Sequence, residues 1–88
     1  MKKVLIVVVL LCALCLSACG GKLIGKDAAL DIALNDAGVE KNKAIDIDVE
    51  LDSDKYNKWY DVEFDSGSIE YEYRIQAETG EILSSKSK

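Results

Sequence analysis

The sequence contains no histidine, and all three of its cysteines, Cys12, Cys15 and Cys19, precede residue 20. Histidine is the usual general acid or base in enzymes, and zinc sites are built mainly from histidine and cysteine ligands. The serines of the chain therefore have no base of the usual kind to activate them. We expect that the protein is not an enzyme and that it carries no cofactor.

Basic side chains are also scarce, with 11 lysines and arginines against 16 aspartates and glutamates and a formal net charge of −5. A protein that binds nucleic acid has to neutralise phosphates with a basic surface. The composition therefore excludes a nucleic-acid partner.

An apolar run from Val4 to Leu16 follows two lysines at the N-terminus. The run is too short to span a bilayer as a helix, which takes about 20 apolar residues, and its basic start is typical of a secretory signal. It ends in Leu16-Ser17-Ala18-Cys19, which resembles the lipobox of bacterial lipoproteins. The resemblance implies cleavage before Cys19, attachment of fatty acyl chains such as palmitate to Cys19, and a lipid-anchored position on the extracytoplasmic side of the cell membrane. Ordinary secretion and an uncleaved anchor are the alternatives.

The chain is thus expected to consist of a lipoprotein signal peptide (1–18), a lipidated tether (19–25), a folded domain (26–83) and a frayed polar tail (84–88). No thiol is left to form a disulfide once Cys12 and Cys15 are removed and Cys19 carries lipid. A domain this small buries only about 60% of the surface of its unfolded chain. A protein partner, or a second copy in a homodimer, would add apolar burial.

Helical periodicity extends from Lys26 to Ala37, and Gly38 is predicted to end the helix in the left-handed conformation of a Schellman motif with Val39. After the helix, apolar residues alternate with polar ones, a repeat of two residues that is typical of β-strands. The alternating segments are 45–51, 59–64 and 69–77, followed by a short strand, Ile82-Leu83. These patterns predict an α+β fold, in which one N-terminal helix packs on one face of a three- or four-stranded antiparallel meander sheet.

Three segments have distinctive sequences: the helix ends in Ala37-Gly38-Val39, residues 59–64 are Trp-Tyr-Asp-Val-Glu-Phe, and residues 71–82 are Tyr-Glu-Tyr-Arg-Ile-Gln-Ala-Glu-Thr-Gly-Glu-Ile. They resemble the PepSY domain of peptidase propeptides and small envelope lipoproteins, with its helix ending in Ala-Gly-Val, its Tyr-x-Val-x-Phe strand and its Tyr-x-Tyr-x-Ile-Asp-Ala-x-Thr-Gly-x-Ile segment. Gln76 stands where the family usually has Asp. The resemblance implies a binding module without catalytic residues, which in some members inhibits peptidases. A protein partner is therefore expected, with a peptidase as one candidate.

The alternation places carboxylates on the face of the sheet that lies away from the helix. A four-residue turn over 65–68 opposes Asp61 to Glu72 and Trp59 to Arg74, and a turn over 54–57 places Glu50 beside Asp61. Two rows are then expected across the sheet: Asp48, Glu63 and Glu70 in one, and Glu50, Asp61 and Glu72 in the other. Like charges opposed across strands destabilise a sheet by up to about 1 kcal/mol a pair, so neutralising Asp61 is expected to stabilise the domain.

The predicted partner- or cation-binding face consists of Glu50, Trp59, Asp61, Glu72 and Arg74. Trp59 is expected to stack on Arg74, either as a surface cation–π pair or as an anchor for a partner. The favoured function is a membrane-anchored extracytoplasmic binding module that engages a partner protein and performs no chemistry, with a peptidase as one candidate that it could modulate. The alternatives are an acidic envelope protein that binds divalent cations weakly without a specific protein partner, a strict peptidase inhibitor, and a charged face that only keeps the sheet soluble.

Overall fold

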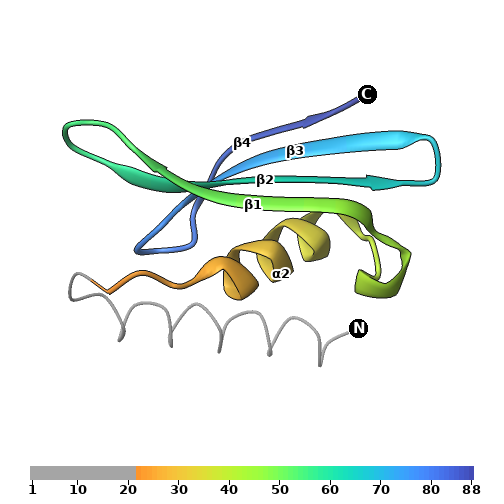
Figure 1. Ribbon diagram of the computed structural model, residues 1–88, viewed down its shortest axis with the longest axis horizontal. Coiled ribbons are helices and arrows are strands. Elements are labelled where there is room, and N and C mark those ends of the chain that lie inside the picture. The colour runs from red at the N-terminus through yellow and green to blue at the C-terminus, as the bar shows by residue number, and fades with distance from the viewer. Residues whose placement is uncertain (1–21) are drawn as a thin grey trace.

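The computed structural model describes residues 22–88, so the expected signal peptide and Cys19 lie outside the described residues. The helix α2 (Lys26–Ala37) and the short 3-10 helix η1 (Lys41–Lys43) are followed by four strands. These are β1 (Ile45–Ser53), β2 (Lys58–Ser66), β3 (Ile69–Gln76) and β4 (Ile82–Ser87). They form an antiparallel meander in the order β1-β2-β3-β4, with α2 along one face (Figure 1). The predicted α+β architecture is confirmed, with four strands.

The end of α2 is fixed by Gly38, which has φ 71° and ψ 30°. The Gly38 N–H donates to the Asn35 carbonyl oxygen at 3.2 Å, and the Val39 N–H donates to the Leu34 carbonyl oxygen at 3.0 Å. These two bonds are those of a Schellman motif. The predicted helix, its last residue and the left-handed glycine are therefore confirmed.

The hydrophobic core lies between α2 and the two central strands. The helix contributes Ala29, Leu30, Ala33 and Leu34, and the sheet contributes Tyr60, Val62, Phe64, Tyr73 and Ile75, together with Ala77. The Phe64 ring stacks on those of Tyr71 and Tyr73, with centroids 5.1 and 6.3 Å away. The Tyr73 hydroxyl donates to Asp36 Oδ2 at 2.9 Å and so ties β3 to the end of α2. Burial, together with this bond, raises the pKa of Tyr73 to about 12.

The chain enters the domain beside the turn between β3 and β4. The Ile24 N–H donates to the Ala77 carbonyl oxygen at 2.8 Å, and the Gly25 N–H donates to the Tyr60 hydroxyl at 3.2 Å. Ile24 also packs against the core. The last residues of the expected tether thus belong to the fold, because their backbone groups and the Ile24 side chain find partners in the sheet.

The register between β2 and β3 differs from the prediction by two residues. Only Gly67 and Ser68 form the turn, and Ser66 pairs with Ile69. Gly67 has φ 61°, and a positive φ at the first of two turn residues is the requirement of a type II′ hairpin. The expected four-residue turn is therefore wrong, and Asp61 pairs with Arg74 instead of Glu72.

The C-terminal residues are ordered, so the expectation of a frayed tail over 84–88 is wrong. β4 continues to Ser87, and the backbone of Lys88 exchanges two hydrogen bonds of 2.8 and 3.0 Å with Glu70. Lys86 lies opposite Glu72, and the Lys88 Nζ lies 3.7 Å from a carboxylate oxygen of both Glu70 and Glu72. Backbone pairing and the acidic neighbours on β3 together hold this lysine-bearing strand in place.

The alternation of β1 is interrupted near its start. The register shifts between Ile45 and Asp48, and Asp46 has φ 51°, so the strand contains a β-bulge. Ile45 consequently pairs with Asp65, a residue of the outer face, and leaves the apolar row that it was expected to begin.

A candidate binding face on the outer side of the sheet

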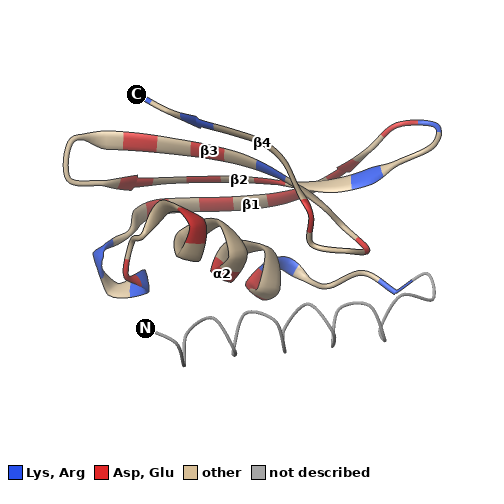
Figure 2. Cartoon of the chain, turned by 180° about the vertical axis from the view of Figure 1, so that it is seen from behind, with Lys and Arg blue, Asp and Glu red and all other residues tan. Residues whose placement is uncertain are grey.

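Acidic residues gather on the side of the sheet away from α2. Figure 2 shows them recurring along β1, β2 and β3, whereas β4 carries lysine. Glu50 pairs with Asp61, as the sequence predicts, and Asp52 pairs with Trp59. The neighbours between β2 and β3 on this face depend on the two-residue turn that joins these strands, because the turn determines which residues are opposite each other.

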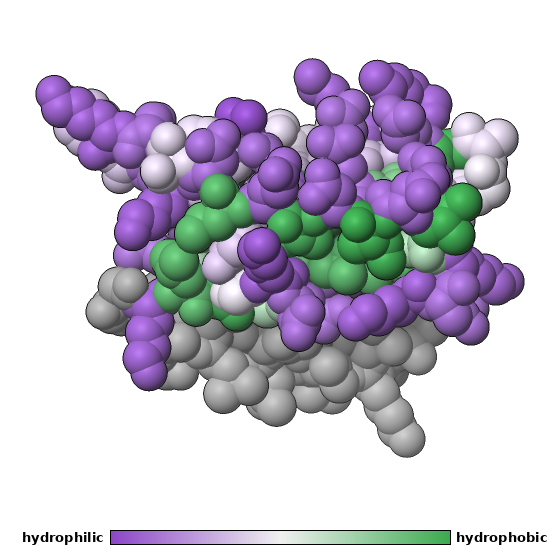
Figure 3. Space-filling view, viewed as in Figure 1, coloured by the Kyte–Doolittle hydropathy of each residue, from purple (hydrophilic) through white to green (hydrophobic). Residues whose placement is uncertain are grey.

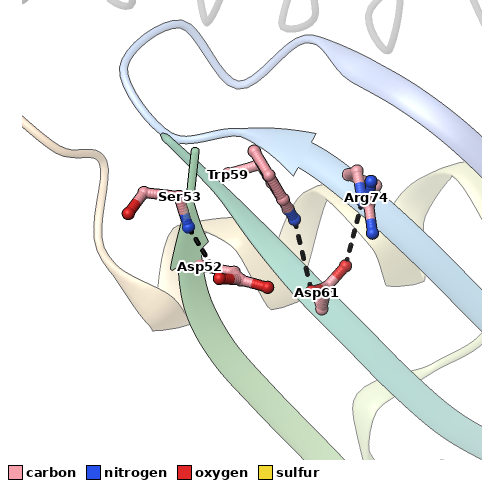
Figure 4. Close-up of polar contacts among 5 residues, drawn as sticks. All are labelled: Asp52, Ser53, Trp59, Asp61 and Arg74. Atoms are coloured by element: carbon pink, nitrogen blue, oxygen red, sulfur yellow. Dashed lines mark hydrogen bonds and ion pairs between the residues drawn. The ribbon is translucent and has the colours of Figure 1, made fainter. Parts of the chain in front are cut away.

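Trp59, Asp61 and Arg74 form a cluster on this face (Figure 4). The Trp59 Nε1 donates to Asp61 Oδ2 at 3.3 Å, and the Arg74 Nε donates to Asp61 Oδ1 at 3.2 Å. The Arg74 guanidinium carbon lies 4.6 Å from the centroid of the Trp59 ring. The predicted stacking is confirmed, although it is diagonal, since Gln76 is the residue opposite Trp59. Each side chain fixes the orientation of the other two.

Of the other residues predicted for this face, Glu50 is the strand neighbour of Asp61, whereas Glu72 lies in a different row. The two-residue change of register places it opposite Glu63, which pairs on its other side with Asp48. The observed rows are therefore Asp48, Glu63, Glu72 and Lys86 in one, and Glu50, Asp61, Arg74 and Ser84 in the other. The second row, expected to be three carboxylates, contains its own counter-charge.

Repulsion is concentrated at Glu63. Glu63 is exposed, but desolvation by its neighbours raises its pKa above the ordinary 4.5, and the charges of Glu72, Asp48, Glu70 and Glu50 raise it further. Asp65 behaves alike: partial burial and the carboxylates of Glu70 and Asp46 raise its pKa above 3.8. Protonation of these groups therefore relieves repulsion.

Residues 23–86 match the PepSY family, described as the peptidase propeptide and YPEB domain. The chain belongs to the PepSY family. The matched range includes α2 and nearly all of the sheet. PepSY domains are linked to peptidases as propeptides or inhibitor-like binding modules, and their roles are regulatory rather than catalytic. No curated protein and no solved structure matches this chain.

Gln76, at the position where the resemblance to the family implied an aspartate, has a structural role that sequence reasoning missed. Its Oε1 accepts hydrogen bonds from the N–H groups of Glu78 and Thr79, at 2.7 and 2.8 Å, and from the Thr79 hydroxyl at 3.2 Å. A side-chain oxygen that caps the following turn is what a glutamine and an aspartate have in common. The replacement keeps an acceptor at this turn without adding another negative charge.

The acidic rows of this PepSY domain do not converge on a point. Within residues 22–88, no group of three or more His, Cys, Asp or Glu side chains is arranged to hold a metal ion. Hard cations such as calcium take six or more oxygen ligands. The alternative of a cation-binding protein therefore has no ligand set in this part of the chain. None of the helices described in the same range is long and apolar enough to cross a membrane.

The two central carboxylates should respond oppositely to neutralisation. We expect Glu63→Gln to raise the free energy of unfolding at neutral pH by a few tenths of a kcal/mol, because it removes repulsion on an exposed, screened face. Asp61→Asn should instead lower it by about 0.5–1 kcal/mol, since Asp61 neutralises Arg74 and accepts the Trp59 bond. Thermal melts of the two variants beside the wild type measure both effects. Stabilisation by Asp61→Asn, which the expected register implied, would contradict the observed pairing.

The raised pKa of Glu63 also predicts how stability depends on pH. Its folded pKa exceeds its unfolded value, so the folded state binds the proton more tightly and stability increases as the pH falls toward the raised pKa. We expect the melting temperature of the wild type to rise between pH 7 and about pH 5, and to rise less in Glu63→Gln. Equal pH dependence in both proteins would show that Glu63 does not carry the effect.

Proposed function

We propose that this protein is a lipid-anchored, extracytoplasmic PepSY module that binds a partner protein, with a peptidase as the favoured class, and performs no chemistry. The PepSY match supports the binding role and the link to peptidases. The lipobox resemblance of Leu16 to Cys19 supports the anchor. Absence of histidine from the whole chain agrees with a role other than catalysis.

The observation that carries the proposal is the cluster of Trp59, Asp61 and Arg74. Tryptophan and arginine are the residues most enriched among the energetic hot spots of protein interfaces. Here the half-buried Trp59 is held by a hydrogen bond and an overlying guanidinium, on the face that the helix leaves uncovered. Little side-chain entropy remains to be lost on binding, and preorganisation of this kind favours affinity.

The proposed anchor would keep this face near the membrane. The fold begins at Ile24, which is bonded to Ala77, so few residues separate Cys19 from the domain. Even a fully extended chain of five residues spans at most about 16–18 Å. The partner should therefore be a membrane protein or an extracytoplasmic protein that approaches the membrane surface.

The test is capture of a partner from solubilised cell envelope by the full-length protein in detergent. We expect Trp59→Ala to reduce capture by about tenfold or more, because truncation of a hot-spot residue removes at least about 1–2 kcal/mol of binding free energy. Tyr56→Ala is the matched control: this tyrosine is 84% exposed at the β1–β2 turn and outside the cluster. A set of captured proteins that is the same for wild type and Trp59→Ala would refute the proposed face. If the captured protein is a peptidase, its activity with and without the PepSY protein distinguishes a strict inhibitor from a non-inhibitory partner.

A further inference from the structure

The strand β1 forms an open edge of the sheet. Its neighbour on one side is β2, and no strand among residues 22–88 pairs with its other side. Natural proteins protect such edges with charged side chains, above all lysine, and with proline, bulges or short strands. The charges of β1 are acidic, so they protect it least against a basic strand. β1 has a bulge only near its start, and from Asp48 to Ser53 it contains neither lysine nor proline. This regular stretch can accept a further strand.

The pairing of β1 with β2 shows which backbone groups are directed to the open side. The Asp54 N–H donates to the Asn57 carbonyl oxygen at 2.9 Å, which makes these two residues a hydrogen-bonded pair. Hydrogen-bonded and non-hydrogen-bonded pairs alternate along an antiparallel ladder, so Asp48, Glu50 and Asp52 face β2 with their backbone groups. The N–H and C=O groups of Val49 and Leu51 consequently point outward to the open edge.

Apolar side chains accompany these free backbone groups. Ile47 is 41% exposed and Leu51 is 44% exposed, although both belong to the helix-facing row, whose buried residues lie on β2 and β3. Figure 3 shows an apolar band across the side of the molecule on which β1 lies, with hydrophilic side chains above it. An added strand would extend the sheet and cover this row.

The charges of β1 indicate whether the added strand would come from a second copy of this protein or from a different protein. All ionisable side chains of the strand are acidic: Asp46, Asp48, Glu50 and Asp52. In a two-fold pairing of β1 with the β1 of a second copy, even-numbered residues lie opposite even-numbered residues in one continuous sheet. The carboxylates of β1 are all even-numbered, so they would face one another. Opposed like charges are destabilising, whereas opposite charges stabilise such pairs. Self-pairing is therefore disfavoured, and a basic strand is favoured.

We propose that the open edge of β1 accepts an extended peptide segment of the partner, in which basic residues alternate with apolar ones. The apolar residues would lie opposite Val49 and Leu51, and the basic residues opposite Asp48, Glu50 and Asp52 in non-hydrogen-bonded pairs, where cross-strand side chains lie closest. Backbone bonds supply affinity in such strand addition, and alternate side chains supply specificity. This inference rests on the proposed function, in that it names the kind of partner segment.

The experiment uses the full-length protein in detergent and three synthetic peptides of about seven residues, the length of an ordinary strand. One peptide alternates lysine with valine, the second has glutamate in place of lysine, and the third is the lysine peptide with N-methyl groups that block backbone pairing. We expect the first to bind about tenfold or more tightly than either of the others. Amide hydrogen exchange should show new protection at Val49 and Leu51, whereas the amides of Asp48 and Glu50 are already protected by β2 in the free protein.

A charge-reversal variant shows whether peptide binding depends on the charge at the β1 edge or only on the net charge of the protein. Glu50→Lys should weaken binding of the lysine peptide and strengthen binding of the glutamate peptide, whereas Glu81→Lys, an equal change at the exposed β3–β4 turn, should not. Equal effects of the two variants, equal binding of the N-methylated peptide, protection on β4 instead of β1, or a dimer joined through β1 would each overturn the inference. Capture of a partner that depends on Trp59 while no peptide binds would leave the proposed function intact and refute only this inference.

Discussion

Replacing Cys19 by serine should abolish lipid attachment and leave the protein either released from the membrane or retained with its signal peptide uncleaved. The reason is chemical: only the thiol of Cys19 can accept the acyl-bearing group at the end of the lipobox-like sequence. Stable anchoring takes two or more lipid signals, since a single acyl chain gives only marginal binding. Phase separation in detergent followed by mass spectrometry of the intact protein measures both attachment and cleavage.

Cys15→Ser is the matched control for this experiment. The substitution also removes a thiol from the N-terminal region, but from the part expected to be cleaved away, so lipid attachment should persist. A wild-type protein that begins at Cys19 and carries no lipid would contradict the proposed anchor, and with it the proximity of the binding face to the membrane.

Most of the fold could be predicted because its signals are local. Apolar residues at helical spacing define α2, and Gly38 followed by Val39 defines its end. Strict alternation over 59–64 and 69–77 identifies β2 and β3 and the face that each buries, and the structure buries Tyr60, Val62 and Ile75 accordingly. Periodicity alone determines the face of a strand, and it determines nothing about which residue lies opposite.

Register was predicted correctly for one hairpin and wrongly for the next. A shift of the register by two residues leaves every side chain on the same face of the sheet, so the alternation of apolar and polar residues accepts both registers equally. Only the turn selects between them. The dipeptide Gly67-Ser68 is a known two-residue hairpin signal, and weighing it above the run of polar residues 65–68 would have placed Arg74 beside Asp61. The missed signal changed the candidate site, because it moved Glu72 away from the cluster and gave Asp61 a positive partner.

The two ends of the sheet depended on contacts that no local pattern reveals. Residues 84–88 are polar and have weak strand propensity, yet they form most of β4, since β3 offers backbone partners and carboxylates for Lys86 and Lys88. The bulge at Asp46 similarly requires positive φ in a residue that is not glycine. Tertiary pairing overrides propensity at both places.

The final prediction is that Gly38→Val destabilises the domain by about 2 kcal/mol or more. Valine must adopt the left-handed conformation at φ 71°, which is costly for a branched Cβ, or else give up the bonds that Gly38 and Val39 donate to the end of α2. A Cβ at Gly38 has no neighbour within 4 Å, so backbone conformation and not collision is the cause. For a domain of this size the loss corresponds to a fall in melting temperature of about 10 °C.

Gly38→Asn provides the control, because asparagine occupies the left-handed region far more readily than valine and also ends helices in Schellman motifs. We expect it to lose well under half as much stability as Gly38→Val. Because the domain is small and without disulfides, its total free energy of unfolding is expected to be only about 3–5 kcal/mol, and the valine variant should leave a measurable unfolded fraction near physiological temperature. Equal melting temperatures for the two variants would mean that the left-handed conformation at Gly38 is not what stabilises the end of α2.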